Sequence, residues 1–448
     1  MRIRIINKIF VFIGFVLFVG HLPAQTLTLD SCIALARRNN VEIRTSQLDI
    51  ENARQVKQAV FTKYFPQVNL AGVGYYAANP LVRFGMDDIQ SDDMRELLSA
   101  IYDLVTEMGS DVKKELSLMK KGVSGSVVAV QPIYAGGRIV TGNKLANLGV
   151  EAAELQAEIK ERDIIENIES TYYLVTGLQQ KVATVTAALD LIDSLDRTVQ
   201  LALDNGLVTR SDALQLQLKR NEMLANQQQL ASGIRLSKQL LCCQIGVEYS
   251  DSLVFMEEPV GSVATMETLA STSARPESRL LELSVEAERL QKRLTLGETL
   301  PQLALIGTGF YGNIIKTDPS ANAVAVLSLS LPLSGWWETS HKLKQHNLRI
   351  EEARMKQAHL SQMMSLEEEK AYSDMLDAAM LMKSDSAALE IAKENYRLST
   401  LNYQAGVVTL SDVLQAHTLL LQAQNAITDR HTTYVVARRR LMDLKKTD

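Results

Sequence analysis

The sequence is poor in cysteine, proline and aromatic residues, and these shortages narrow the class of protein. It has only three cysteines in 448 residues, and this odd count predicts no disulfide framework. Cys242 and Cys243 are adjacent and Cys32 is the third, so we interpret all three as small apolar residues within helices. Aromatic residues make up 5% of the chain and hydrophobic residues 46%, which favours long helices over a compact mixed fold.

Basic residues are also fewer than acidic residues. The chain has 47 lysines and arginines against 52 aspartates and glutamates, a net charge of −5. Because an acidic chain is repelled by a phosphate backbone, nucleic acid is not an expected partner.

The first 24 residues have the features of a cleaved secretory signal peptide. Basic residues at positions 2, 4 and 8 precede an apolar run at 9–19, and the small residue Ala24 stands before Gln25. The run is too short to span a bilayer, and no cysteine follows it that would carry a lipid anchor. No other segment reaches about 18 uninterrupted apolar residues, so we expect no transmembrane helix in the mature chain.

The nine prolines leave two long proline-free stretches, residues 133–258 and 333–448. Because proline breaks helices and the apolar residues recur at helical spacing, each stretch predicts very long helices. Each stretch is interrupted once, by nearly the same phrase: NGLVTRSDALQ at 205–215 and AGVVTLSDVLQ at 405–415.

The repeated phrase has the chemistry of a turn between two helices. Gly206 and Gly406 suit the left-handed position that ends a helix. A threonine followed by an aspartate three residues later, Asp212 or Asp412, matches a capping box that starts the next helix. Each copy therefore predicts a helical hairpin, with entering arms of roughly 60 residues or about 90 Å, which must pack side by side as coiled coils.

A second duplication marks β-strands. The segment beginning Phe65-Pro66-Gln67 aligns with the one beginning Leu300-Pro301-Gln302, and Gln131-Pro132 aligns with Leu331-Pro332. The flanking segments are rich in β-forming or alternating residues, are about ten residues long, and have aromatic residues at both ends, which is typical of strands that cross an outer membrane. An ordinary soluble hairpin with aromatic flanks is the alternative.

These features divide the chain into two structural repeats. The first, 25–246, has strands at about 66–76 and 123–134, an extra external loop at about 87–121 and a hairpin tip at about 204–212. The second, 275–448, has strands at about 301–311 and 322–332 and a tip at about 404–412. Residues 247–274 form a linker or equatorial region. In the extra loop, apolar residues from Met94 to Met108 at helical spacing predict a short helix, which either caps a pore mouth or is a solvated elaboration.

Four strands cannot close a barrel. An open edge in lipid would leave backbone groups unpaired at several kcal/mol each, and closed barrels need about eight strands or more. Two chains would close only a barrel filled by side chains, whereas three would supply twelve strands around an aqueous channel. The predicted fold is therefore mainly α-helical, with a transmembrane β-barrel shared by a homotrimer.

With these elements in order, the chain resembles the TolC family of outer-membrane efflux and secretion channels. The first helix beginning LTLDSCIALARRNN at residue 27, the segment ARPE at 274–277 and the junction QPIYAGGR at 131–138 all resemble family segments. The resemblance implies a twelve-stranded barrel in the outer membrane of a Gram-negative bacterium and a helical tunnel across the periplasm. It also implies docking to a periplasmic adaptor protein and an inner-membrane transporter, proton-driven or of the ABC type.

The resemblance assigns the hairpin tips two roles. Gly206, Leu207, Val208, Gly406, Val407 and Val408 match the turns where adaptors dock. Asp412, Tyr403, Asp212 and Ser211 match residues of the periplasmic aperture. The alternative for both aspartates is helix capping alone, but three copies of Asp412 around one axis would repel one another, favour cations and tend to have raised pKa values.

Two positions depart from the family pattern. Val408 stands where an arginine is usual, and Gln415 stands where a second acid is usual. The set of charged side chains that the resemblance would assign to holding the aperture closed is therefore incomplete. The aperture either closes by packing or uses other residues such as Arg210.

The sequence contains no enzyme constellation and predicts no cofactor or metal. The five histidines beyond the signal peptide are on predicted helices, and His341 and His346 do not share a face. Without an ATP-binding motif the chain depends on a partner pump for energy. We predict a passive duct that carries small molecules to the exterior. The alternatives are an outlet for type I protein secretion and, in another class, a secreted coiled-coil scaffold protein.

Overall fold

The structure, a computed structural model, describes the greater part of the predicted repeats. The described residues are 26–78, 82–85, 91–107, 115–118, 121–206, 208–251, 253–256, 275–312 and 319–445. The predicted signal peptide, residues 257–274 of the predicted linker and Leu207 lie outside them. Over these ranges, no helix combines the length and apolar character needed to cross a membrane.

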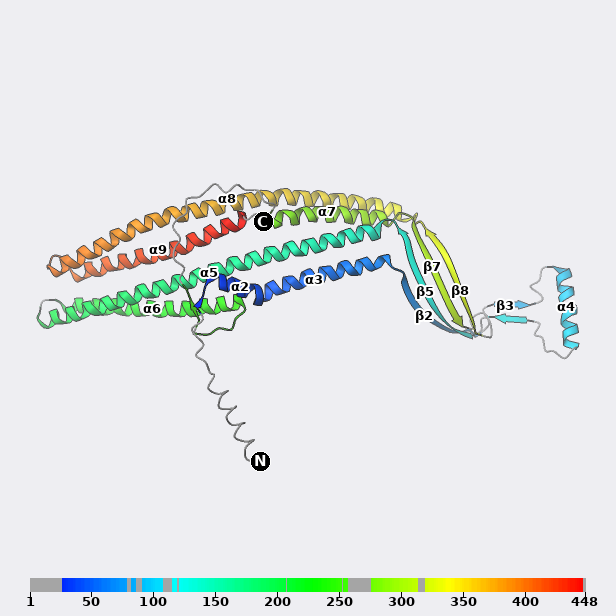
Figure 1. Ribbon diagram of the computed structural model, residues 1–448, viewed down its shortest axis with the longest axis horizontal. Coiled ribbons are helices and arrows are strands. Elements are labelled where there is room, and N and C mark those ends of the chain that lie inside the picture. The colour runs from blue at the N-terminus through cyan, green and yellow to red at the C-terminus, as the bar shows by residue number, and fades with distance from the viewer. Residues whose placement is uncertain are drawn as a thin grey trace, which may run out of the picture. The chain divides into compact units, whose positions relative to one another are not determined.

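The chain is mainly helical, as predicted (Figure 1). Its helices are α2 (Leu29–Asn39), α3 (Val41–Phe61), α4 (Asp92–Glu107), α5 (Arg138–Asp204), α6 (Arg210–Ile245), α7 (Pro276–Gly297), α8 (Gly335–Gln404) and α9 (Leu410–Lys445), with a short 3-10 helix at Thr62–Tyr64. The entering arms α5 and α8 have 67 and 70 residues. Because neither contains a proline, the backbone hydrogen bonds run through each without a break.

Contacts within the chain define two compact units. We call residues 1–52, 151–282 and 355–448 the hairpin unit, and residues 53–150 and 283–354 the sheet unit. Helices α3, α5, α7 and α8 contribute residues to both units.

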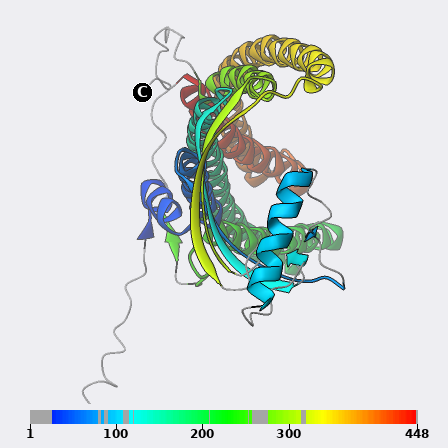
Figure 2. The ribbon, with the colours of Figure 1, turned by 90° about the vertical axis from the view of Figure 1, so that its right-hand side faces the viewer.

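The sheet unit contains a four-stranded antiparallel sheet. Its strands are β2 (Gln67–Tyr76), β5 (Lys121–Ala135), β7 (Gln302–Gly312) and β8 (Ser320–Ser330), in the order β2-β5-β7-β8. The predicted pairs β2–β5 and β7–β8 form within the two repeats, and β5 pairs with β7 between them. The sheet is curved (Figure 2). Strands β2 and β8 are left at its two edges.

Two strand boundaries show the effect of proline. β8 ends at Ser330 rather than near position 332, because Pro332 has no N–H to donate to a ladder. In β5 the register with β7 shifts between Pro132 and Tyr134, since a proline inside a strand is accommodated by a bulge.

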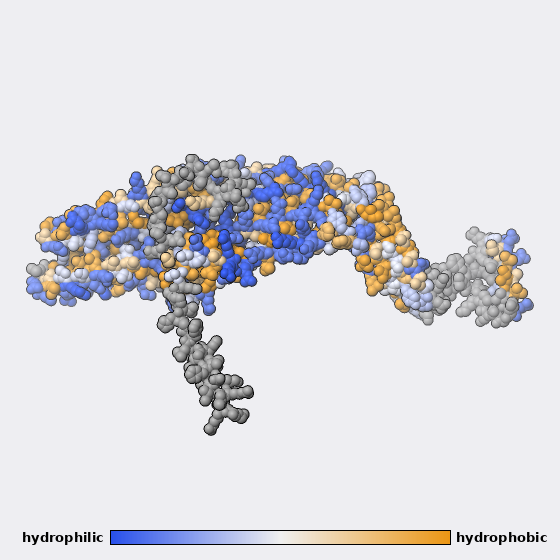
Figure 3. All heavy atoms as spheres, in the orientation of Figure 1, coloured by the Kyte–Doolittle hydropathy of each residue, from blue (hydrophilic) through white to orange (hydrophobic). Residues whose placement is uncertain are grey.

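The sheet exposes apolar side chains, which appear as orange spheres over the strands (Figure 3). In β8, Leu327 and Leu329 are 62% and 72% exposed, and they alternate with Ser328 and Ser330 on the opposite face. Exposed aromatic residues flank the strands: Tyr64, Phe65, Tyr134, Trp336 and Trp337 at the end joined to the helices, and Tyr76 and Tyr311 at the other end.

The extra segment of the first repeat lies between β2 and β5. Its helix α4 covers most of the region predicted to be helical, although Met108 lies outside the described residues. The structure adds a feature that the sequence analysis did not predict, an antiparallel pair of short strands, β3 (Val82–Gly85) and β4 (Glu115–Leu118). A four-residue strand is too short for alternation to identify it in the sequence.

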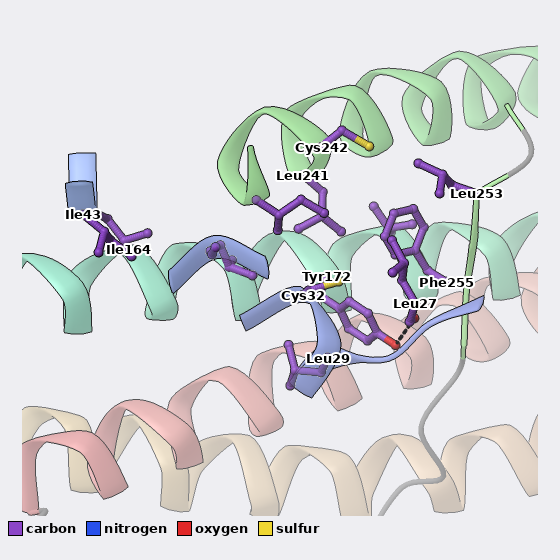
Figure 4. Close-up of a cluster of buried hydrophobic side chains, with 14 residues drawn as sticks. Leu27, Leu29, Cys32, Ile43, Ile164, Tyr172, Leu241, Cys242, Leu253 and Phe255 are labelled. Atoms are coloured by element: carbon purple, nitrogen blue, oxygen red, sulfur yellow. Dashed lines mark hydrogen bonds between the residues drawn. The ribbon is translucent and has the colours of Figure 1, made fainter. Parts of the chain in front are cut away.

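In the hairpin unit, a hydrophobic core joins α2 to the long helices. Strand β1 (Thr26–Leu27) pairs in parallel with β6 (Val254–Phe255), so the predicted linker region contributes a strand at its start. Tyr172 of α5 is buried beneath this pair and donates its hydroxyl to the Met256 carbonyl at 2.6 Å. The same hydroxyl lies 3.3 Å from the Leu27 carbonyl (Figure 4).

An ion-pair network fixes the start of α7 within the hairpin unit. Arg162 contacts Glu277 at 2.6 Å, and Arg275 contacts Glu367 at 3.1 Å. Burial is the largest single influence and by itself would raise the pKa of the Glu277 carboxyl, but the hydrogen bonds it accepts and the positive charges of Arg162 and Arg275 together hold the pKa below its ordinary value. The network therefore links α5, α7 and α8 through charged, hydrogen-bonded pairs.

Candidate functional site: the two hairpin tips

The first hairpin tip lies between α5 and α6. Gly206 has φ 71°, in the left-handed region, and its N–H donates to the Leu203 carbonyl at 2.9 Å. Thr209 then begins α6 as its N-cap. The Thr209 N–H donates to Asp212 Oδ2 at 2.9 Å, and the Asp212 N–H donates to Thr209 Oγ1 at 3.2 Å. The predicted capping box is therefore complete.

The second tip, between α8 and α9, repeats this geometry. Gly406 has φ 74°, its N–H donates to the Tyr403 carbonyl at 3.0 Å, and the Val407 N–H donates to the Asn402 carbonyl at 2.8 Å. This pair of bonds is a Schellman motif, which ends a helix at a left-handed residue. Asp412 Oδ2 accepts from the Thr409 N–H at 2.9 Å and from the Thr409 hydroxyl at 2.7 Å.

The predicted docking residues differ in exposure. Gly206 and Gly406 are exposed, and Val407 is 72% exposed. Val208 and Val408 are only half-buried, and Val208 packs against the apolar core behind the tips. The exposed part of each tip is therefore its glycine turn.

The two tips share one apolar core, which we call the tip cluster. It contains Val185, Ala188, Leu189, Ile192 and Val199 of α5, Ala213, Leu216 and Met223 of α6, and Leu410, Leu414 and Leu421 of α9. The tips differ at one matched position, because Leu410 is 2% exposed whereas Arg210 is exposed. Apolar packing thus joins the hairpins, and Arg210 stays at the surface of the first tip.

Tyr403 brings the second tip into electrostatic range of the first. It is half-buried and packs against the tip cluster. Burial, and next the negative charge of Asp212, raise the pKa of its hydroxyl above the ordinary value. Two of the four predicted aperture residues, Tyr403 and Asp212, thus interact electrostatically although they belong to different hairpins.

Asp412 has a different environment. It is exposed, as is Ser211 at the first tip. Hydrogen bonds from the Thr409 hydroxyl, and then from the Thr409 backbone N–H, lower the pKa of the Asp412 carboxyl. The capping bonds favour the ionised carboxylate, so the raised pKa expected for a ring of three carboxylates would have to overcome them.

His417 is a tip residue that the sequence analysis weighed only as a metal ligand. It lies on α9, is 4% exposed, and its ring centroid is 5.3 Å from that of Tyr396. Burial, and next the positive charge of Lys219, lower the pKa of its imidazole. No group of three potential metal ligands occurs in the part of the chain that the structure describes. The sequence signal that could have found His417 is its spacing from Leu410, Val413 and Leu414 along one buried helix face.

Comparisons with known proteins give a fold and a family match over part of the chain. Residues 271–444 match the family described as outer membrane efflux protein. No relative was found among curated protein sequences. The fold matches the Campylobacter jejuni outer membrane channel CmeC with a TM-score of 0.76 at 14% identity, over 93% of this chain and 85% of that one.

Two further solved structures have the same fold. The Vibrio cholerae outer membrane protein VceC matches with a TM-score of 0.72 at 16% identity, over 93% of this chain and 96% of that one. The open state of the Neisseria gonorrhoeae outer membrane channel MtrE matches with a TM-score of 0.73 at 16% identity, over 95% and 92% of the two chains. These findings confirm the predicted TolC-like fold.

Proposed function

We propose that this chain, which matches the outer membrane efflux protein family over residues 271–444 and has the fold of TolC family channels, is the outer-membrane duct of a tripartite efflux system. In this function it is a passive channel in the outer membrane of a Gram-negative bacterium. It carries small molecules from a periplasmic adaptor and an inner-membrane transporter to the exterior.

The open sheet is the observation that carries the proposal. Among the residues that the structure describes, no strand pairs with the outer side of β2 or of β8. The sheet also exposes large apolar side chains such as Leu70 and Leu329. Exposed aromatic residues at both strand ends are placed as interfacial girdles would be. Unpaired edges in lipid cost several kcal/mol per backbone group, so three copies close the sheet into a twelve-stranded barrel.

The tips supply the periplasmic end of this duct. The glycine turns at Gly206 and Gly406, with Leu207, Val208, Val407 and Val408, dock the adaptor, because backbone turns without bulky polar groups allow close approach of another helix. Val407 supports this role most directly, because its apolar side chain is 72% exposed and available to the adaptor.

The residues that form the periplasmic aperture are Asp412, Tyr403, Asp212 and Ser211. Asp412 and Ser211 are exposed at the tips, where three copies would bring several carboxylates toward one axis. Tyr403, near Asp212 and against the tip cluster, holds the second hairpin to the first in the closed arrangement. Val408 and Gln415 are uncharged and cannot form an ion pair across the aperture. Closure of the aperture therefore depends on this packing.

Membrane extraction and bilayer recording test the proposal. We expect the chain to fractionate with the outer membrane, to require detergent for extraction, and to migrate as a heat-sensitive trimer. The purified trimer should form discrete pores in planar bilayers. Extraction without detergent, a heat-insensitive monomer and absence of pores would instead identify a coiled-coil scaffold.

A further inference from the structure

Helix α4 has an apolar stripe with coiled-coil spacing that no other described part of the chain covers. Met94, Leu97, Ile101 and Leu104 follow one another at intervals of three, four and three residues, the a and d positions of successive heptads. They are 51%, 58%, 48% and 60% exposed, respectively. The hydrophobic residues appear as an orange strip on α4, with hydrophilic residues beside it (Figure 3).

No charged residue of α4 occupies an a or d position of this stripe. In the same heptad frame, Glu96 and Asp103 occupy c positions, on the outer side of a coiled coil. Asp92 is also on the outer side, at an f position, whereas Asp93 and Glu107 occupy g positions at the edges of the stripe. Arg95 is the only lysine or arginine of this helix. Packing of the stripe against another helix would therefore bury apolar side chains, leave Glu96 and Asp103 in water, and keep Asp93 and Glu107 at the solvent-facing edge of the contact.

The acidic face argues against a lipid surface as the partner of the stripe. Amphipathic helices that lie on membranes have lysine and arginine on their polar face, because lipid phosphates attract them. The acidic face of α4 would be repelled by those phosphates. A lone helix of 16 residues is also marginal in water, so a neighbour for the stripe would stabilise it.

The topology supplies copies of α4 as that neighbour. The extra segment of the first repeat, which contains α4, starts where β2 ends. Because β2 is an edge strand, this segment emerges where one copy of the chain would meet the next. It also leaves the sheet at the strand ends opposite those joined to α3 and α5. In a closed trimer, three tethered copies of α4 would share one mouth, and tethering gives them a high effective concentration.

We propose that the three α4 helices of a trimer pack through Met94, Leu97, Ile101 and Leu104 into a three-helix bundle that constricts the outer mouth of the duct. The inference rests on the proposed trimeric duct. The partner of α4 is then the same helix in the other two copies. The consequence is restricted entry into the duct from outside.

Cysteine crosslinking tests this packing in the full-length trimer. Cys243 is exposed and Cys32 and Cys242 are buried, so the tests use a Cys243→Ser background. Ile101→Cys places a thiol on the stripe, and Asp103→Cys places one on the outer side of the same turn. With a short bis-maleimide, we expect interchain products that survive heating for Ile101→Cys and their loss for Asp103→Cys.

The outcomes separate the bundle from the duct. A heat-sensitive, pore-forming trimer without selective crosslinking at position 101 overturns the bundle and leaves the duct intact. Crosslinking to a different protein likewise overturns it, in favour of a foreign partner. If no trimer or pore forms in the Cys243→Ser background, the proposed function fails and the bundle with it.

Conductance gives a second readout. Ile101→Asp places three carboxylates in the proposed seam and should open it, so that single-channel conductance rises while the trimer persists. Ser99→Asp adds the same charge at an f position on the opposite side and should leave conductance unchanged. Equal conductance in the two variants and the parent would contradict a constricting bundle.

Discussion

At the scale of single residues, the hairpin turns depend on backbone conformation more than on side-chain contact. A Cβ added to Gly406 would meet no atom within 4 Å, yet the residue has φ 74°. The cost of substitution there is therefore conformational, about 1–2 kcal/mol for an L residue in the left-handed region. The same reasoning applies to Gly206.

We predict that Gly406→Ala lowers the thermal unfolding temperature of the purified protein. Gly149→Ala is the matched control, since Gly149 lies within α5, also has no atom within 4 Å of an added Cβ, and has no positive φ. That substitution should raise stability, by roughly 0.5–1 kcal/mol. Equal unfolding temperatures for the two variants would show that the turn tolerates an L residue.

His417 predicts a loss of stability in mild acid. Its folded-state pKa lies below the ordinary value of about 6.5 for histidine because of burial and the charge of Lys219, and within the described residues Nδ1 has no hydrogen-bond partner. The unfolded chain therefore binds a proton more readily, so stability falls as pH drops below about 6.5 and levels off below the folded-state pKa. The groups facing the ring are Lys219 of α6 and Tyr396 of α8.

The measurement is the unfolding temperature as a function of pH for His417→Gln. The variant should lose part of the acid sensitivity because glutamine does not titrate. His341→Gln, at an exposed position on α8, should retain the parental pH profile. An unchanged profile in His417→Gln would assign the acid sensitivity to other groups.

At the scale of elements, β8 has two faces with opposite requirements. Leu327 belongs to the alternating apolar face, and Ser328 points to the other face. In a barrel, the first faces lipid and the second faces the lumen. An arginine on the lipid face costs about 2–4 kcal/mol near the bilayer midplane, whereas lumen positions accept charge.

We therefore predict that Leu327→Arg reduces the yield of heat-sensitive trimer in the outer membrane, while Ser328→Arg assembles normally. The two substitutions add the same side chain at neighbouring positions, so expression and strand propensity are matched. Quantification of the trimer band before and after heating measures the difference. Normal assembly of both variants would mean that this face does not contact lipid.

The elements that sequence reasoning identified are those whose chemistry is local. Gly406, Thr409 and Asp412 lie within seven consecutive residues and by themselves predict a turn and a helix cap. The lack of proline likewise predicts the long helices. Strands β3 and β4 were missed because they are short, and the burial of His417 because it arises from helices distant in sequence. The proximity of Tyr403 to Asp212 likewise requires the fold.

At the scale of the whole molecule, assembly decides whether a capping residue is also a functional one. Asp212 and Asp412 have nearly identical capping bonds, with 2.9 Å from the threonine N–H in both. Asp212 is half-buried and close enough for its charge to affect Tyr403, whereas Asp412 is exposed. In a trimer, only a difference in position relative to the shared axis would distinguish their effects on ion flow.

We predict that Asp412→Asn lowers the cation selectivity of the reconstituted pore more than Asp212→Asn does. Asparagine keeps one oxygen that can accept the capping bonds, so both variants lose one charge per copy with similar small losses of helix capping, about 1 kcal/mol at most. Reversal potentials in a salt gradient across planar bilayers measure the selectivity. If both variants shift the potential equally, the carboxylate of Asp412 has no special place at the aperture; if Asp412→Asn alone shifts it, three exposed charges at the second tip select the ions.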